Sequence, residues 1–479
     1  MQTPKGRVIG VIPLHAVRWV EHPGGLRMTF DAERMLMQSR HIMIDGYNLA
    51  LEKGTGVATY SRNLSLELSK LGHKIDLLYG VRSSTGKNPL MNEVTFFDPK
   101  TKNVPALEVV QALTHTNFGI TAHQVPITGK VVARGPVRSL PPHDRIFNSR
   151  NLFTYARWHF RAFGRFLKTD YDQAAEIAHW TYPLPVQLRK STNIYTIHDL
   201  VPLRLPYTTL DNKKEYYRIV RDIARDADHI VTVSETSKRD IIDLLGVEER
   251  RVTNTYQSVS LPEAVLNRSI DEVSEEVAAI FGLDPKKYFL FFGAIEPKKN
   301  VGRIIEAYLA SQSKFPLVIV GQLTWKNASD LRLLGVPVSD GPKTKRGAPL
   351  DPSISAVSRA QQVIRLEYLP LNLLASLIRC ARSVVFPSLY EGFGLPILEA
   401  MQLGTAVITG TEGSSPEVAG DSAYIVDPYD VGAITRAIRA MQNDSDMVAH
   451  YEALGKERAK AFSPERYSER LTTLYDKLR

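Results

Sequence analysis

The sequence has a single cysteine, Cys380, in 479 residues, so no disulfide can form within the chain. Its neighbours (LIRCARSVVF) are mostly apolar, which favours a buried packing role for this thiol. Long apolar runs are also missing, because no stretch of about 18 such residues occurs, and no transmembrane helix is expected. The first residues lack the apolar core and cleavage site of a secretory signal. We therefore expect a cytoplasmic protein.

The composition is typical of a globular protein, with 43% hydrophobic and 23% charged residues. A chain of this length exceeds a single hydrophobic core, which predicts two or more domains. The formal net charge is +9. Between Lys130 and Lys168, nine Lys or Arg residues accompany one acid, Asp144. The excess positive charge is thus concentrated in one segment of the chain.

Two segments have the pattern of a strand, a turn, a helix and a second strand, which is the opening of a doubly wound sheet. The first begins at HIMIDGYNL and ends with the strand KIDLLYG. Its helix carries an apolar face and a terminal glycine, formed by Tyr60, Leu64, Leu68, Leu71 and Gly72. The second, about 245 residues later, is KKYFLFFGAIEPKKNVGRIIEAYLA followed by FPLVIVG. Two Rossmann-like domains are therefore predicted.

A polar, broken segment between these openings, Ser258 to Glu276, is interpreted as a linker. The predicted N-terminal domain then covers residues 41–262, and the predicted C-terminal domain covers 277–458. Residues 1–40 show no consistent periodicity and are treated as an extension of uncertain status. The amphipathic segment at 459–479 is predicted to be a helix.

The stretch PSLYEGFGLPILEAMQLGTAV carries the strongest chemical signal. Its glutamates, Glu391 and Glu399, flank a glycine turn that leads into a helix, with Pro396 at the start and Gly404 after the end. Such a turn presents free N–H groups and the positive end of the helix dipole, which suits phosphate. The carboxylates suit hydroxyl groups, which donate hydrogen bonds to them. Phosphate beside paired hydroxyls indicates a sugar nucleotide.

This stretch resembles the E-x7-E motif of the retaining glycosyltransferases of family 4, and the following SSPEVAGDSAYIVDP fits as well. The resemblance implies an α/β protein of the GT-B fold, with two Rossmann-like domains facing across a cleft and a C-terminal helix that crosses back to the first domain. It also implies that Glu391 contacts the donor sugar and that Glu399 binds the nucleotide ribose. The turn between them is expected to bind the donor through Gly392, Phe393, Gly394 and Leu395.

The segment GAIEPKKN resembles the EP(R/K)KN signature of the same family, whose final lysine pairs with the donor diphosphate. The resemblance implies this role for Lys299, and Lys298 is a further donor-binding candidate. Fixed cations lower the barrier where a departing diphosphate gains charge. A solvated basic turn is the alternative interpretation. Many relatives place an arginine where this chain has Ala294, so a second cation has to come from elsewhere, or the site relies on lysine and the helix dipole.

Two other segments are expected in the cleft. The turn GTGV contributes Gly54 and Gly56, which in the family lie beside the donor phosphate, although a plain tight turn is the alternative. His198, in TIHDLVPLRLP, resembles the donor-facing histidine of the family and is assigned to catalysis. Its neighbour Asp199 is expected to orient the loop. The predicted catalytic residues are therefore His198, Glu391 and Lys299.

Two D-x-D patterns, Asp226–Asp228 and Asp444–Asp446, invite a metal interpretation, because this pattern can hold Mg²⁺ at a nucleotide. The first, however, lies where a helix runs into a strand, and it resembles a stretch without a metal role in GT-B enzymes. We expect neither a metal nor a cofactor. No role is derived for the SSPE motif at Glu417.

The basic segment contains a predicted amphipathic helix over residues 152–168. Its apolar face is formed by Leu152, Phe153, Ala156, Phe160, Phe163, Phe166 and Leu167. Its basic face is formed by Arg157, Arg161, Arg165 and Lys168. Two interpretations stay open: the helix docks on an anionic membrane, which would place the protein on the inner face of the cell membrane, or it packs its aromatic side on the first domain. A nucleic-acid partner is not expected, because no nucleic-acid module accompanies the charge.

Taken with these residues, the resemblance implies a retaining, metal-independent hexosyltransferase. It would move a sugar from a nucleotide-sugar donor to a hydroxyl of a glycan or lipid-linked acceptor in cell-surface polysaccharide synthesis. The wording EPKKN and EGFGLPILEAM is similar to that of bacterial polysaccharide mannosyltransferases, which favours GDP-mannose as donor. Two alternatives remain: another GT-B enzyme such as a nucleotide-sugar epimerase, and a non-catalytic donor-binding scaffold of a polysaccharide assembly complex. Loss of turnover with retained nucleotide binding in Glu391→Ala would separate enzyme from scaffold.

Overall fold

The structure is a computed structural model. It describes residues 39–51, 56–83, 86, 88–99, 116–131, 140–259, 261–322 and 363–478, together with the backbone of two strands in the first forty residues. Those two strands, β1 (Val17–His22) and β2 (Gly25–Phe30), pair antiparallel. Within the described residues, no helix is both long and apolar enough to cross a bilayer.

The first domain is built on a sheet with the strand order β13-β12-β11-β9-β3-β4-β7-β6 in the described part of the chain. Every neighbouring pair is parallel except β6 with β7. The central strands are buried along their length, as expected for a parallel sheet covered by helices on both faces. The strands are β3 (His41–Asp45), β4 (Lys74–Tyr79), β6 (His123–Gln124), β7 (Arg145–Asn148), β9 (Ile177–Trp180), β11 (Thr192–Thr196), β12 (His229–Thr232) and β13 (Val252–Asn254).

A smaller parallel sheet in the order β10-β8-β5 belongs to the same domain. Its strands are β5 (Ile120–Thr121), β8 (Leu167–Asp170) and β10 (Val186–Leu188). The helices of the first domain are α1 (Gly56–Lys70), α2 (Pro89–Phe97), α4 (Leu152–Phe163), α5 (Val201–Arg204), α6 (Lys213–Asp226) and α7 (Glu235–Leu245), with the 3₁₀ turns η4 (Pro206–Thr208) and η5 (Glu249–Arg251). On α1, the predicted apolar face is confirmed, because Tyr60, Leu64 and Leu68 are fully buried.

The second domain has an all-parallel sheet in the order β16-β15-β14-β17-β18-β19 in the described part of the chain. The strands are β14 (Phe289–Phe292), β15 (Leu317–Val320), β16 (Val363–Leu366), β17 (Ser383–Phe386), β18 (Val407–Gly410) and β19 (Tyr424–Val426). The helices are α10 (Val301–Ser311), α13 (Leu371–Cys380), α14 (Leu395–Gln402), α15 (Ser415–Ala419), α16 (Val431–Asn443) and α17 (Ser445–Ala459), with the 3₁₀ turns η6 (Pro297–Lys299) and η7 (Lys460–Phe462). Cys380 is fully buried in this domain, as expected. Two doubly wound domains are thus confirmed.

The segment interpreted as a linker contains two helices, α8 (Glu263–Leu266) and most of α9 (Ile270–Phe281). Ser269 caps α9: its hydroxyl accepts a hydrogen bond from the Glu272 N–H, and the Glu272 carboxylate accepts one from the Ser269 N–H. Arg268 and Glu276 form an ion pair at 2.7 Å, and the Glu276 carboxylate also accepts from Ser376 on α13. The polar residues of this stretch therefore cap a helix and hold it against the second domain.

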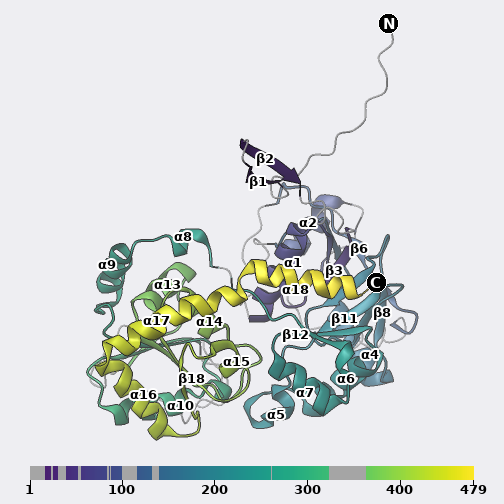
Figure 1. The fold of residues 1–479 in the computed structure, drawn as a ribbon. Coiled ribbons are helices and arrows are strands. Elements are labelled where there is room, and N and C mark those ends of the chain that lie inside the picture. The colour runs from purple at the N-terminus through teal and green to yellow at the C-terminus, as the bar shows by residue number, and fades with distance from the viewer. Residues whose placement is uncertain are drawn as a thin grey trace.

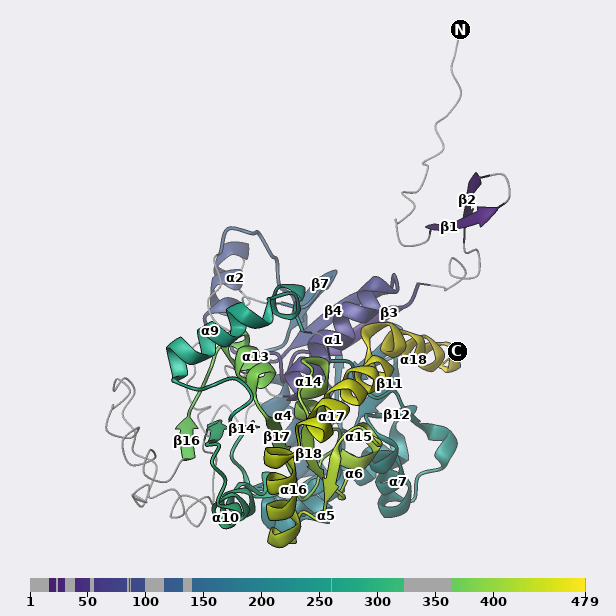
Figure 2. The ribbon, with the colours of Figure 1, turned by 60° about the vertical axis from the view of Figure 1, so that its left-hand side comes forward.

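The last helix, α18 (Pro464–Lys477), crosses back to the first domain as predicted. Figures 1 and 2 both show it lying against that domain while α17 stays with the second. Ser468 donates a hydrogen bond to Glu67 of α1 at 2.8 Å, and Tyr475 lies 2.6 Å from Nδ1 of His179 on β9. Burial lowers the pKa of His179 to about 3, so this imidazole is neutral. The crossover helix is thus anchored in the first domain by buried polar contacts.

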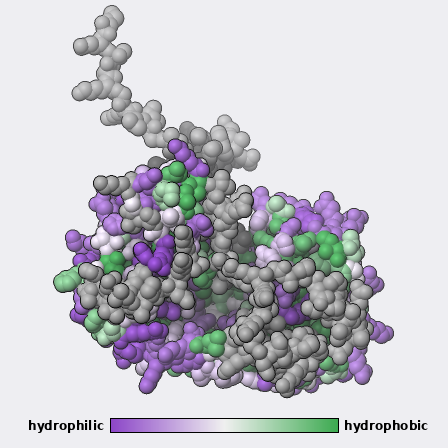
Figure 3. All heavy atoms as spheres, turned by 180° about the vertical axis from the view of Figure 1, so that it is seen from behind, coloured by the Kyte–Doolittle hydropathy of each residue, from purple (hydrophilic) through white to green (hydrophobic). Residues whose placement is uncertain are grey.

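Helix α4 differs from its prediction. It ends at Phe163, where Gly164 adopts φ 63° and closes the helix, and the chain then continues as strand β8. Most of the apolar face is buried, with Phe153 at 6% and Phe160 at 0% exposure, whereas Phe163 at the end of the helix is 39% exposed. Packing on the first domain, the second of the two interpretations, is therefore what the structure shows for most of this face. On the side seen in Figure 3, the hydrophobic residues with described positions form small, separate patches among hydrophilic ones.

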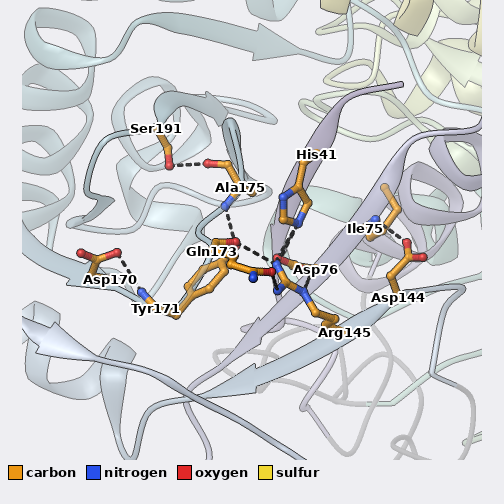
Figure 4. A network of polar contacts seen from close by, with 10 residues as sticks. All are labelled: His41, Ile75, Asp76, Asp144, Arg145, Asp170, Tyr171, Gln173, Ala175 and Ser191. Atoms are coloured by element: carbon orange, nitrogen blue, oxygen red, sulfur yellow. Dashed lines mark hydrogen bonds and ion pairs between the residues drawn. The ribbon is translucent and has the colours of Figure 1, made fainter. Parts of the chain in front are cut away.

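A polar network joins the amino-terminal ends of the central strands, on the sheet edge opposite to the carboxyl ends (Figure 4). Arg145 donates to both carboxylate oxygens of Asp76, at 2.9 and 2.8 Å, and Asp76 is fully buried. His41 lies 2.7 Å from the same carboxylate, and Arg145 also reaches the carbonyl of Gln173. The hydrogen bonds to Asp76 raise the pKa of Arg145. These contacts cross-link β3, β4 and β7.

Replacing Arg145 by methionine is expected to lower the free energy of unfolding by about 2 kcal/mol, because a buried carboxylate loses its charged partner. The loss is limited because His41 remains in contact with Asp76. Denaturant titration of both proteins measures it. The matched control is Arg466→Met, which removes an exposed pair with Glu469 and should change little. Equal stability of the Arg145 variant and wild type would contradict this assignment.

Candidate active site

The predicted site residues gather where the carboxyl ends of strands from both domains meet, which is where ligands bind in open parallel sheets. The turn after β17 leads into α14, whose N-cap Gly394 has φ 96°. A left-handed residue of this kind is possible without strain only for glycine. The helix starts at Leu395, one residue before Pro396, and Gly404 follows it at φ 75°. The predicted glycine turn and the helix start that follows it are therefore present in the fold.

Lys299 and Glu391 form the central contact of the site. The Lys299 ammonium lies 2.6 Å from Oε1 of Glu391 and 4.7 Å from the centre of the Phe386 ring. The two side chains are 12% and 7% exposed, so the pair is almost entirely buried. Burial alone would raise the pKa of Glu391, but Lys299 and Lys298 more than offset this and hold it below its usual value. Glu391 is therefore an ionised carboxylate.

Lys298, the second predicted lysine, lies on the same 3₁₀ turn. Its ammonium is 3.7 Å from the Glu296 carboxylate. Burial favours its neutral form, but Glu391, Asp199 and Glu296 outweigh this and raise its pKa. The site thus holds two ammonium groups, those of Lys299 and Lys298.

Glu399 lies in α14 and has a different environment. Burial raises its pKa to about 7, and the nearby charge of Lys299 lowers it only in part. Its charge therefore changes within the physiological range, whereas Glu391 stays ionised. The two glutamates of the motif are not equivalent.

One glycine, Gly392, permits close contact between the domains at this point. A Cβ on Gly392 would lie 2.6 Å from the carbonyl oxygen of His198 and 2.9 Å from Cβ of Asp199, so only glycine fits there. Gly56, the first residue of α1, lies with its Cβ position 3.5 Å from the Leu395 side chain. The predicted partner Gly54 lies outside the described residues. The turn before α14 is thus pressed against the first domain.

His198 lies at the carboxyl end of β11. Its Nε2 donates a hydrogen bond to the carbonyl of Thr181 at 2.9 Å, which leaves Nδ1 as the acceptor nitrogen. Burial lowers the pKa of His198, although the Thr181 carbonyl and Asp199 raise it in part. Tyr60 meets its ring edge-on, with centroids 4.9 Å apart, and Tyr60 also contacts Thr196, which contacts His179. A ring contact joins His198 to Tyr60, and buried hydrogen bonds continue from Tyr60 through Thr196 and His179 to Tyr475 of the crossover helix.

Asp199 accepts a hydrogen bond from the Val201 N–H at 3.0 Å, in agreement with its expected role in the loop. Phe393, predicted at the donor, is only 4% exposed. Its ring packs against Tyr256 and Phe462, with centroids 6.3 and 5.6 Å away. Only the backbone groups of Phe393 are therefore available to contact a ligand.

A cavity of about 580 Å³ opens between the domains beside His198. The second domain contributes Glu296 and Lys298 to its wall, and the first domain contributes the rest. Among its lining residues are Arg157 and Arg161 of α4, Tyr182, and the 208–212 loop. A volume of this size is typical of small-molecule sites. The basic face of α4 thus lines a cavity next to the predicted catalytic residues, a placement that helical periodicity did not indicate.

Glu417, for which the sequence suggested no role, bridges the domains. Its carboxylate accepts hydrogen bonds from the N–H groups of Glu235 and Thr236, at 2.7 and 3.0 Å, and from the Thr236 hydroxyl. It therefore caps the start of α7 from the other domain, where the helix dipole favours an anion. The preceding Ser414 donates to the carbonyl of Glu391 from both its N–H and its hydroxyl. The SSPE motif thus connects interdomain contact to the position of Glu391.

Glu417→Ala is expected to raise the KM of a substrate bound between the domains about tenfold, because the interdomain contact loses charge–dipole and hydrogen-bond energy of about 1.5 kcal/mol. A raised KM alone does not show that the two domains have separated. Small-angle scattering measures this, and it should show an increased radius of gyration for the variant. Glu412→Ala, an exposed neighbour, is the matched control. An unchanged KM together with unchanged scattering would refute the bridging role.

The D-x-D residues have other contacts. Asp226 forms an ion pair with Arg225 at 2.6 Å, and Asp228 accepts from the N–H of Asn193. Asp444 caps α17 by accepting from the Met447 N–H at 2.8 Å. In the part of the chain that the structure describes, no three His, Cys, Asp or Glu side chains gather in a way that could hold a metal ion.

Comparison with known proteins relates most of the chain to two family models. Residues 54–261 match the model described as Glycosyltransferase Family 4, and residues 273–460 match the model described as Glycosyl transferases group 1. The O-antigen chain mannosyltransferase B of Escherichia coli is 31% identical over 287 residues, which is 59% of this chain and 69% of that protein. The serotype-specific mannosyltransferase WbdA of Escherichia coli is 27% identical over 290 residues, which is 59% of this chain but only 33% of that longer protein.

Among solved structures, the complex of Anabaena Alr3699/HepE with UDP and glucose has a TM-score of 0.59. The likeness covers 91% of this chain and 99% of that one, at 12% identity. At this identity the likeness shows the fold alone. That fold has the two facing domains described above.

Proposed function

This chain belongs to glycosyltransferase family 4, and we propose that it transfers mannose from GDP-mannose to a hydroxyl of a glycan acceptor, with retention of configuration. The observation that carries the proposal is the Lys299–Glu391 pair beside the start of α14, with Lys298 as a second cation. The choice of mannose as the sugar and of a polysaccharide as the acceptor rests on the names of the relatives, an O-antigen chain mannosyltransferase and a serotype-specific mannosyltransferase.

In the proposed reaction the diphosphate lies against Lys299, Lys298 and the N–H groups at Gly394. The bond between the anomeric carbon and the diphosphate oxygen breaks, and the acceptor oxygen bonds to the same face of that carbon. The acceptor proton passes to a leaving phosphate oxygen. The lysines stabilise the charge that develops on the diphosphate. Glu391, held ionised, accepts hydrogen bonds from sugar hydroxyls, and no covalent intermediate is formed.

Neither a metal nor a cofactor is part of the proposal. Two ammonium groups and a helix N-terminus supply the positive charge that a diphosphate needs. Phosphate binding of this kind relies on fixed protein charges, which are already in place before the donor arrives.

The test combines thermal shift and turnover on the purified full chain. For the thermal shift, GDP, UDP, TDP and ADP are each added with and without EDTA. For turnover, GDP-mannose is supplied together with mannose-containing acceptors. We expect stabilisation by GDP that chelation does not change, and an α-linked product by NMR. Stabilisation only by another nucleotide would overturn the choice of donor. Nucleotide binding without any transfer would favour the non-catalytic scaffold.

A further inference from the structure

Asp45, at the carboxyl end of β3, is a fully buried carboxylate that the proposed reaction does not use. Among the described residues, its hydrogen bonds come from uncharged donors, namely the N–H and the hydroxyl of Thr181 and the N–H of Tyr47. The equally buried Asp76, by contrast, forms an ion pair with Arg145. A carboxylate held only by uncharged donors is costly to bury, and such groups are concentrated at functional sites. Asp45 also lies on the sheet edge where ligands bind in folds of this kind.

Thr181 connects Asp45 to His198 across this sheet edge. The strands lie in the order β11-β9-β3, and Asp45 ends β3, Thr181 follows β9, and His198 follows β11. One oxygen of Asp45 accepts from both the N–H and the hydroxyl of Thr181, the latter at 2.8 Å. The Thr181 carbonyl in turn accepts from Nε2 of His198 at 2.9 Å. Hydrogen bonds therefore lead from the buried carboxylate to the imidazole, one strand at a time.

The contact with Thr181 decides which nitrogen of His198 carries the proton. A carbonyl oxygen only accepts hydrogen bonds, so the proton of the neutral ring has to be on Nε2. The hydrogen bond made by one ring nitrogen thus determines the state of the other. Burial lowers the pKa of His198, so the ring is neutral and Nδ1 keeps its lone pair. Because His198 lines the cavity between the domains, this choice sets the hydrogen-bonding character of the cavity wall.

The position of Thr181 depends on Asp45. Thr181 is fully buried, and its hydroxyl also accepts from Ser61 of α1 at 2.9 Å. Burial raises the pKa of Asp45 to about 6, although the bonds from Thr181 lower it in part. At pH 8 the group is therefore an ionised carboxylate, and hydrogen bonds to an ionised acceptor are about twice as strong as those between neutral groups. Loss of this charge would loosen Thr181 and, with it, the carbonyl that orients His198.

We infer that Asp45 is a positioning residue for sugar transfer, which acts through Thr181 to hold His198 in its Nε2–H tautomer and in a fixed orientation. Asp45 has no exposed surface, so it acts through Thr181 and not by contact with a ligand. The inference rests on the proposed function for its effect on turnover. The tautomer of His198 is a property of the chain itself and can be measured without substrate.

The first measurement is nitrogen NMR of the full chain with isotope-labelled histidine at pH 8, where the His198 signals are assigned by their loss in His198→Ala. We expect wild type to carry the proton on Nε2. In Asp45→Asn, which keeps the shape but not the charge, both ring signals should move toward the average of the two tautomers. Thr181→Val, which removes only the hydroxyl, should show a smaller shift, and Thr181→Ser should match wild type. Unchanged His198 signals in the folded Asn and Val variants would overturn the inference.

The second measurement is turnover of GDP-mannose at the same pH. Asp45→Asn should lower kcat about tenfold, as expected for the loss of hydrogen bonds to a charged group, and should leave the affinity for GDP unchanged. In a His198→Ala background the same change should have no further effect, because two changes that act through one residue are not additive. Losses that multiply in the double variant would overturn the inference, because Asp45 would then act independently of His198.

The matched control is Asp76→Asn, the same substitution at a buried carboxylate of the neighbouring strand, near the opposite edge of the sheet. It should lower the thermal midpoint but leave kcat and the His198 signals unchanged. Thermal midpoints show which variants are folded, and if Asp45→Asn is not, the two Thr181 variants decide. If wild type transfers no mannose, the proposed function fails, whereas the NMR measurement still decides whether Asp45 holds His198.

Discussion

Replacement of Lys299 by methionine is expected to lower kcat by about 10² to 10³, the largest effect of any single change proposed for this protein. The ammonium is in place before the reaction, 2.6 Å from Glu391, and acts where the leaving diphosphate gains charge. Removing one such fixed group typically costs about 2.7–4 kcal/mol of transition-state stabilisation. Donor binding should weaken less, because Lys298 and the start of α14 remain. Initial rates against donor concentration separate the two quantities.

The control for this prediction is Lys287→Met, an exposed lysine of the same domain that pairs with Asp284. Lys299→Met also leaves Glu391 without its closest cation, so the variant has to be shown to fold. The double variant Lys299→Met and Glu391→Gln removes both charges, and its thermal midpoint should lie above that of the single variant. A kcat within a few-fold of wild type in the folded single variant would show that Lys299 does not stabilise the leaving diphosphate.

Glu399 is expected to make nucleotide binding depend on pH. Its pKa is raised to about 7 by burial, so a larger fraction is protonated at pH 6 than at pH 8. Ribose hydroxyls donate hydrogen bonds to the ionised carboxylate, and binding should therefore strengthen roughly tenfold from pH 6 to pH 8. Glu399→Gln should weaken nucleotide binding at pH 8 by roughly 100-fold, because bonds to a charged group contribute about 1.5–3 kcal/mol. Its affinity should also no longer change with pH across this range.

Calorimetric titration with GDP at several pH values measures both effects. The matched control is Glu457→Gln on α17, which is exposed and outside the cleft, and whose pH profile should follow wild type. The terminal phosphate of GDP also titrates in this range, so the difference between Glu399→Gln and wild type is the quantity to compare. Identical profiles for these two proteins would refute the role of Glu399 at the ribose.

Much of the fold could be predicted because its signals are local. The apolar face of α1 and the buried strands β3, β4, β14 and β15 follow from hydrophobic periodicity. The end of α4 was predicted at 168 and lies at Phe163, because Gly164 in a left-handed conformation competes with a periodic pattern that continues into β8. An amphipathic pattern also does not say what covers the apolar face. A membrane and a protein core both require apolar residues, and in α4 the core covers Leu152, Phe153, Ala156 and Phe160.

The site was predictable to the same depth. Glu391 lies on the turn after β17, Glu399 lies in the helix that follows this turn, and Lys299 lies on the 3₁₀ turn after β14. Their positions near the sheet edge therefore follow from neighbouring residues. Glu417 was missed because its partners, Glu235 and Thr236, are about 180 residues away in the sequence. Asp45 and Thr181 were missed as a pair for the same reason. A Gly followed by Ser-Ser-Pro-Glu indicates a helix start but says nothing about a second helix that it caps.

The sequence by itself determined two doubly wound domains and a phosphate-suited helix start flanked by two glutamates, because periodicity, glycine and proline act over a few residues. Only the tertiary structure decided which side chains from the other domain face that helix start. It brought His198 within reach of Gly392, made Glu417 a cap for α7, and gathered Arg157, Thr209 and Tyr182 around one cavity. These contacts join residues far apart along the chain. Their distances follow from how two sheets pack against each other, which no local pattern of residues specifies.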